Sequence, residues 1–84
     1  MQPRRVVWQE HNLRHLTQDH PERRVTREDV EDVLANTERQ EEDDPSHGTT
    51  VAQGRNRDGV AYVVAFIELS DGSAFPVHAR RGKA

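Results

Sequence analysis

Two residues near the end of the chain, His78 and Arg80, have the types and spacing needed to hold a phosphate group. If segment 73–80 is a strand, both side chains point to the same face, because alternate residues of a strand share a face. The planar guanidinium of arginine matches the oxygens of a phosphate. Histidine titrates near neutral pH and can carry a proton. The alternative is that His78 is an ordinary hydrogen-bonded structural residue.

A second polar and aromatic group lies near the start of the chain, on a predicted helix over 9–18. Trp8, Asn12 and His15 are spaced i, i+4, i+7, and His15 is a further candidate acid or base. His11 and His15 also have the i, i+4 spacing of a metal site, but no third ligand is in register, so we expect no metal and no cofactor. The alternative is that Asn12 and His15 hydrogen-bond to the sheet or to a neighbouring loop.

The element that must position His78 and Arg80 is built around the run 60–69, VAYVVAFIEL. An uninterrupted apolar run rich in β-branched and aromatic residues is typical of a strand covered on both faces. Asp-Gly pairs precede and follow the run, and Asp-Gly favours tight hairpins. The sequence therefore predicts a three-stranded antiparallel meander over 49–56, 60–69 and 73–80. Pro76 lacks a backbone donor, which predicts that the last strand is an edge.

The turns decide which residues share a face. A two-residue turn at Asp71-Gly72 pairs Ala65 with His78 and Val63 with Arg80. A similar turn at Asp58-Gly59 would put Arg55 on the face opposite Arg80. A three-residue turn with a bulge would bring Arg55 to the Arg80 face, and the sequence leaves both possibilities open.

The first half of the chain predicts a short strand over 3–8 and helices over 9–18 and 25–36. Thr26 followed by Asp29 resembles a capping box. The apolar stripe is expected to pack on Val63 and Ile67, with Ala61 and Ala65 allowing close approach; its members are Leu13, Leu16, Val30, Val33 and Leu34. The prediction is one α+β domain over 1–84, with both helices on one face of the sheet.

Composition limits the possible functions. Only 32% of the 84 residues are hydrophobic, and the absence of cysteine excludes disulfides and cysteine-ligated metals. No signal peptide or membrane span is apparent, so a cytoplasmic protein without membrane contact is expected. Net charge is −3; residues 28–44 hold nine acids and one base, which leaves +5 for the rest. We interpret 38–48 as an acidic loop, either a solvated linker or a contact for a basic partner, and 80–84 as a basic tail.

The order of these elements and several short motifs resemble the BrnT-like toxins of bacterial type II toxin–antitoxin systems, which have a RelE-type fold. The matching residues are Trp8, Asn12 and His15 in WQEHNLRH, His20, Val25 with 28–34 in VTREDVEDVL, Gly54-Arg55, and Ala79-Arg80. The match spans about 6–81. The connection 19–24 is longer than is usual in that family, and family members usually continue past the Ala-Arg motif into a basic helix.

The resemblance implies a metal-independent endoribonuclease that inhibits translation and is neutralised by a cognate antitoxin in a hetero-oligomer. By position, Arg55 and Arg80 belong to its basic cleft. For the proton transfers we expect His78 or His15, because histidine titrates near neutral pH. Candidate RNA-binding residues are Arg4, Arg5, Asn12, Arg57 and Arg81. The alternative is a non-catalytic protein-binding module, or a degenerate toxin, of the same fold. No P-loop, dinucleotide or metalloprotease motif competes with these interpretations.

Overall fold

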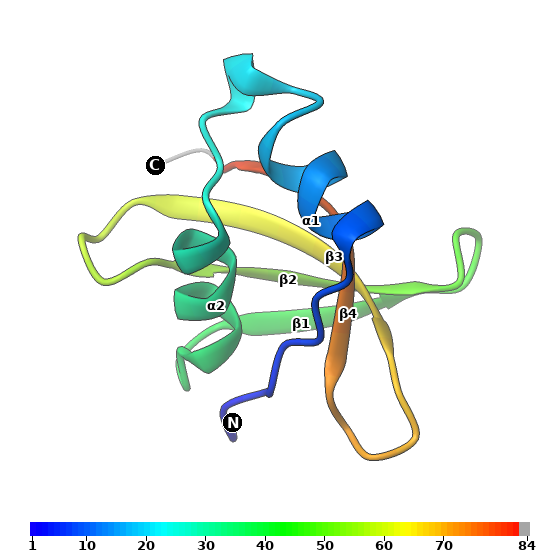
Figure 1. Ribbon diagram of the computed structural model, residues 1–84. Coiled ribbons are helices and arrows are strands. Elements are labelled where there is room, and N and C mark those ends of the chain that lie inside the picture. Colours follow the sequence, from blue (N-terminus) through cyan, green and yellow to red (C-terminus); the bar gives the residue numbers. More distant parts are fainter. Residues whose placement is uncertain (83–84) are drawn as a thin grey trace.

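The structure is a computed structural model that describes residues 1–82 (Figure 1). Two helices precede four strands in the chain. Helix α1 covers Glu10–Thr17 and α2 covers Arg27–Ala35, with a 3-10 turn, η1, at Pro21–Arg23 between them. The strands are β1 at Gln40–Asp44, β2 at Thr49–Arg55, β3 at Ala61–Glu68 and β4 at Ala74–Arg81. The fold is therefore α+β, as the sequence predicts.

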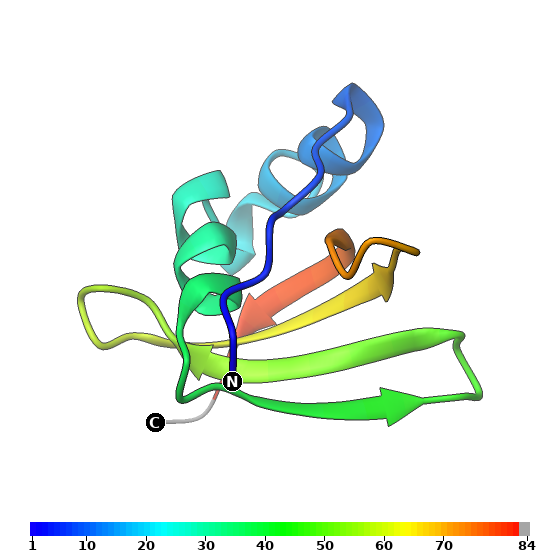
Figure 2. The ribbon, with the colours of Figure 1, turned by 90° about the horizontal axis from the view of Figure 1, so that it is seen from below.

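The strands form one antiparallel sheet in the order β1-β2-β3-β4. Both helices lie on the same side of it (Figure 2), with α1 against β4 and α2 against β2 and β3. The predicted position of the apolar run is confirmed, because β3 is an interior strand, and β4 is the predicted edge. The opposite face of the sheet carries no helix in the described part of the chain.

The expected acidic loop over 38–48 is wrong in its first half, because Gln40–Asp44 forms β1 and pairs with β2. A strand needs no apolar side chain when its backbone pairs with a neighbour and it lies at the sheet edge. Here alternation turns Glu41 towards the helix side, where it meets Arg4 and Arg39. The meander therefore has four strands rather than three.

The predicted N-terminal strand over 3–8 is reduced to one isolated parallel bridge between Val6 and Ala74. The segment does run beside the start of β4, where Val7 donates to the Ala74 carbonyl and Ala74 donates to the Arg5 carbonyl, both at 2.8 Å. The two helix predictions are confirmed. Thr26 Oγ1 accepts from Asp29, whose carboxylate accepts from the Thr26 amide in return.

The β2–β3 and β3–β4 hairpins have three-residue loops, so the two-residue turn predicted at Asp71-Gly72 is wrong. Leu69 pairs with Ser73 around that loop, and Gly72 takes a φ of +86° that a side chain would disfavour. An irregularity between Ala65 and Phe66 shifts the register by one residue, which restores the predicted pairs Ala65 with His78 and Val63 with Arg80. The β2–β3 hairpin has the three-residue loop that the sequence left open as an alternative. Arg55 therefore pairs with Ala61 and lies on the same face of the sheet as Arg80.

The predicted packing face of β3 is also wrong. The helices pack on Tyr62, Val64 and Phe66, whereas Ile67 is 42% exposed on the other face. A run without polar alternation cannot indicate which of its two faces meets the helices. The helix stripe itself is confirmed for the buried residues Leu16, Val30, Val33 and Leu34. Within residues 1–82, no helix has the length and apolarity to span a membrane.

Candidate anion-binding groove

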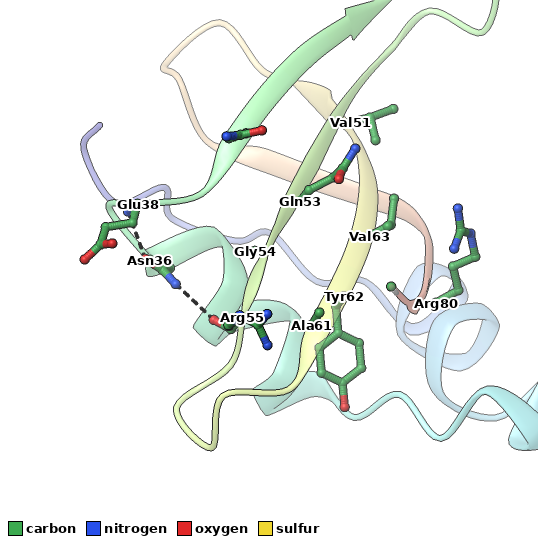
Figure 3. A pocket seen from close by; sticks show the side chains of 12 residues that line it. Asn36, Glu38, Val51, Gln53, Gly54, Arg55, Ala61, Tyr62, Val63 and Arg80 are labelled. Carbon is green, nitrogen blue, oxygen red and sulfur yellow. Dashed lines mark hydrogen bonds between the residues drawn. The ribbon is translucent and has the colours of Figure 1, made fainter. Parts of the chain in front are cut away.

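The uncovered face of the sheet is hollowed into a groove that contains both predicted catalytic arginines. One hollow of about 680 Å³ is lined by Arg55, Arg80 and Val63 among others (Figure 3). A second hollow of about 550 Å³ shares Val63 and Arg80 with the first and extends along β4 to His78. The two form a continuous concave surface across β2, β3 and β4, which we call the sheet groove.

Arg55 and Arg80 reach the sheet groove from β2 and β4, with β3 between them. Arg55 pairs with Ala61 and Arg80 with Val63, so two interstrand spacings and two residues along the strand separate their backbones, roughly 12 Å. Arg55 donates to the Gly59 carbonyl at 2.6 Å and Arg80 donates to the Arg81 carbonyl at 3.2 Å. Neither is seen in an ion pair with a carboxylate in the described chain, so both guanidinium groups retain donors for an anion.

His78 lies at the β4 end of the groove and is half-buried. Its Nδ1 atom is 3.3 Å from Nη1 of Arg23, a residue of η1. Burial, together with the positive charges of Arg23 and Arg80, lowers the pKa of His78 below its ordinary value. His15 and His20 add to this effect, and their own rings stack edge-to-face at 5.6 Å. His78 is therefore predominantly neutral at pH 7.

The arginines divide into two groups. In the structure, six form ion pairs with carboxylates: Arg4, Arg5, Arg14, Arg27, Arg39 and Arg57. For the other five, none within 4.0 Å is seen among residues 1–82: Arg23, Arg24, Arg55, Arg80 and Arg81. Three of these five are the groove arginines and the η1 residue that contacts His78. Positive charge without an internal partner is thus concentrated at this part of the molecule.

Two of the residues predicted to bind RNA, Arg4 and Arg57, form ion pairs within the protein. Arg4 makes a double contact with Glu41, reaches Glu68 at 2.6 Å and lies over the Phe66 ring. Arg57 holds Asp32 through Nε and Nη2 at 3.1 and 3.0 Å. Both guanidinium groups are therefore engaged in holding the fold together.

The other three candidates differ in exposure. Asn12 is buried and donates to the Pro76 carbonyl at 3.0 Å, which matches the structural alternative. Arg5 is exposed and lies 4.0 Å from Asp71, at the N-terminal end of the chain. Arg81 lies over the Tyr62 ring, with its guanidinium carbon 6.0 Å from the ring centroid. Of the basic tail 80–84, residues 83 and 84 lie outside the described residues.

Three of the nine carboxylates of the acidic segment 28–44 form ion pairs with arginines of the described residues: Glu31, Asp32 and Glu41. Glu41 lies between Arg4 and Arg39, and the hydrogen bond from Arg4 is the main reason that its pKa is lowered. The hydrogen bond from Arg57 likewise lowers the pKa of Asp32. The arginines that pair with this segment come from the N-terminus, the start of α2, the residue before β1 and the β2–β3 hairpin. These ion pairs offset part of the negative charge of the segment.

His15 is brought near the site without contacting it directly. It lies in the last turn of α1, 3.4 Å from Asp19, and its charge contributes to the lowered pKa of His78. Arg23 is the residue that sequence reasoning missed, because it lies in an irregular connection with no periodic pattern. Within residues 1–82, no group of three potential ligands is placed to hold a metal ion.

Comparison of the chain with known proteins gives no relative from which the roles of these residues could be transferred. No family model, no curated protein and no solved structure matches the chain. The function must therefore be argued from the site itself.

The chemistry available in the sheet groove is that of a phosphate-binding site. Arg55 and Arg80 offer donors and positive charge to the oxygens of an anionic transition state. His78 offers one ring nitrogen beside them. Apolar side chains of Val51, Val63 and Ala65 line the hollow between the strands.

Proposed function

We propose that the chain is the toxin of a type II toxin–antitoxin system, a cytoplasmic, metal-independent endoribonuclease with a BrnT-like, RelE-type fold. The observation that carries the proposal is that Arg55, Arg80 and His78 line one groove on the uncovered face of the sheet. Arg55 and Arg80 are the residues that the resemblance assigns to the cleft, and they come from strands that are not adjacent in the sheet; His78 is the candidate that strand alternation adds to them.

In this proposal, RNA lies across the sheet groove and Arg80 with Arg55 stabilises the negative charge that develops on the scissile phosphate. Attack by the 2′-hydroxyl requires a base, and departure of the 5′-oxygen requires an acid. We assign these proton transfers to His78 or His15. A cognate antitoxin would inhibit the enzyme by covering the groove as part of a hetero-oligomer.

A non-catalytic protein-binding module is the second candidate. It is favoured by the apolar groove floor and by Ile67, which is 42% exposed on the same face. It is also favoured by the contact between Arg23 and His78, which already engages one ring nitrogen. The two candidates predict different growth of bacteria that produce the chain alone.

The test is induced expression in bacteria with and without the adjacent open reading frame. We expect growth arrest by the chain alone, rescue by the adjacent gene, and loss of arrest in Arg80→Ala. Arg14→Ala is the matched control, because Arg14 is exposed, pairs with Glu10 and lies outside the groove. Full growth with the wild-type chain alone, at confirmed expression, would replace the toxin by the binding module.

A further inference from the structure

An unusual arrangement of like charges surrounds His78. Arg23 approaches it from η1 and Arg80 lies two residues along β4. His15, in α1, and His20, the residue before η1, also contribute to the lowered pKa of His78. The carboxylates Asp19 and Glu22 contact His15 and His20, each at 3.4 Å. Asp44, which lines the same hollow as His78 and Arg80, contacts His47 at 2.9 Å. No carboxylate within 4.0 Å of Arg23 or Arg80 is seen in residues 1–82.

The contact between Arg23 and His78 determines the protonation of the imidazole. A guanidinium has only donors, so Nδ1 of His78 must accept and cannot carry a proton. The proton of the neutral ring is then on Nε2. His78 in this state is a hydrogen-bond donor through Nε2 rather than a base through that atom.

Arg23 is held in place by the backbone around it. Its amide donates to the His20 carbonyl at 3.0 Å, and Pro21 at the first position of η1 fixes the entry of the turn. Arg24 closes the turn in the left-handed region, with φ 52°. A non-glycine residue in that region carries a cost, so the turn is specified by its surroundings.

We infer that Arg23, His78 and Arg80 together form an oxyanion site that binds a phosphate of the nucleic acid substrate. Arg23 and Arg80 supply charge, and Nε2–H of His78 donates to a phosphate oxygen. The inference deepens the proposed ribonuclease function and rests on it for the source of the phosphate. It adds Arg23 as a phosphate-binding residue and makes His78 a donor in the resting state.

The experiment is a titration of the purified full chain with inorganic phosphate, followed by the side-chain nitrogen and carbon resonances of its histidines. We expect the wild type to show the Nε2–H tautomer of His78, with phosphate shifting the His78 signals. Arg23→Ala should weaken phosphate binding at least tenfold and mix the two tautomers. Arg23→Lys should retain part of the affinity, because it keeps the charge but loses the planar fork.

Arg24→Asn is the matched control, because it removes one positive charge at the position next to Arg23. Asparagine tolerates the left-handed backbone region that Arg24 occupies. We expect less than a twofold change in its phosphate affinity. Unchanged affinity in a folded Arg23→Ala variant would overturn the inference, as would a wild type that shows no phosphate effect on His78. Phosphate binding that depends on Arg23 in a chain that cleaves no RNA would retain this site and reject the ribonuclease.

Discussion

His78 shows how one side chain can report on the site through its titration. Its pKa is lowered in the folded chain by burial and by Arg23 and Arg80, whereas an unfolded histidine titrates near 6.5. Below that pH the unfolded chain takes up more protons than the folded one. His78 therefore leaves the free energy of unfolding unchanged above the pKa that it has in the unfolded chain. As pH decreases below that pKa, His78 lowers the free energy of unfolding.

We predict that the wild type loses more stability between pH 7 and pH 5.5 than His78→Asn, whose amide oxygen can replace Nδ1 as the acceptor for Arg23. Urea unfolding at several pH values in a buffer without phosphate measures the effect. Parallel pH profiles for the two proteins would show that His78 is not held neutral by its neighbours.

The residues of the groove differ in how far the sequence could predict them. Strand alternation is enough to put His78 and Arg80 together, and the predicted pairs with Ala65 and Val63 are confirmed. Arg23 contacts His78 across 55 residues through an irregular turn, and no periodic pattern encodes such a contact. Whether Arg55 lies on the same face as His78 and Arg80 depended on a difference of one residue in the length of the β2–β3 loop. A register shift of one residue moves every side chain of a strand to the opposite face.

Strand β1 illustrates how a polar segment can be essential to a fold. Glu41 and the side chain of Arg39 are almost fully buried, and Arg39 Nε donates to Glu41 at 2.7 Å. Arg4 completes the cluster from the N-terminal segment. Composition alone indicated a loop for 38–48, because it carries no information about an arginine 37 residues away that neutralises Glu41.

We predict that Glu41→Ala destabilises the chain by about 3–5 kcal/mol, because it leaves two arginines without their buried partner. Glu42→Ala, one residue along the same strand and exposed, should change stability by less than about 0.5 kcal/mol. Chemical unfolding of the two variants measures the difference. Equal and small effects would mean that the acidic segment is the solvated surface its composition suggests.

The molecule as a whole assigns different tasks to its two sheet faces. The helix face buries Tyr62, Val64 and Phe66 and supplies the hydrophobic core. The other face holds the groove with Arg55 and Arg80, two of the five arginines for which no carboxylate partner is seen within residues 1–82. The apolar run of β3 predicted burial on both faces. Val63 and Ala65 are partly exposed because the described chain covers only the other face of the sheet. In the proposed function, the second cover is RNA or the antitoxin.

The most direct test of the proposed function is cleavage of single-stranded RNA by the purified chain in the presence of a metal chelator. We predict cleavage by the wild type, a loss of about 10²–10³ in rate for Arg80→Ala, and no change for Arg14→Ala. The thermal midpoint of each variant shows whether it is folded. If folded Arg80→Ala cleaves at the wild-type rate, or if the folded wild type cleaves no RNA, the sheet groove is not the active site of a ribonuclease.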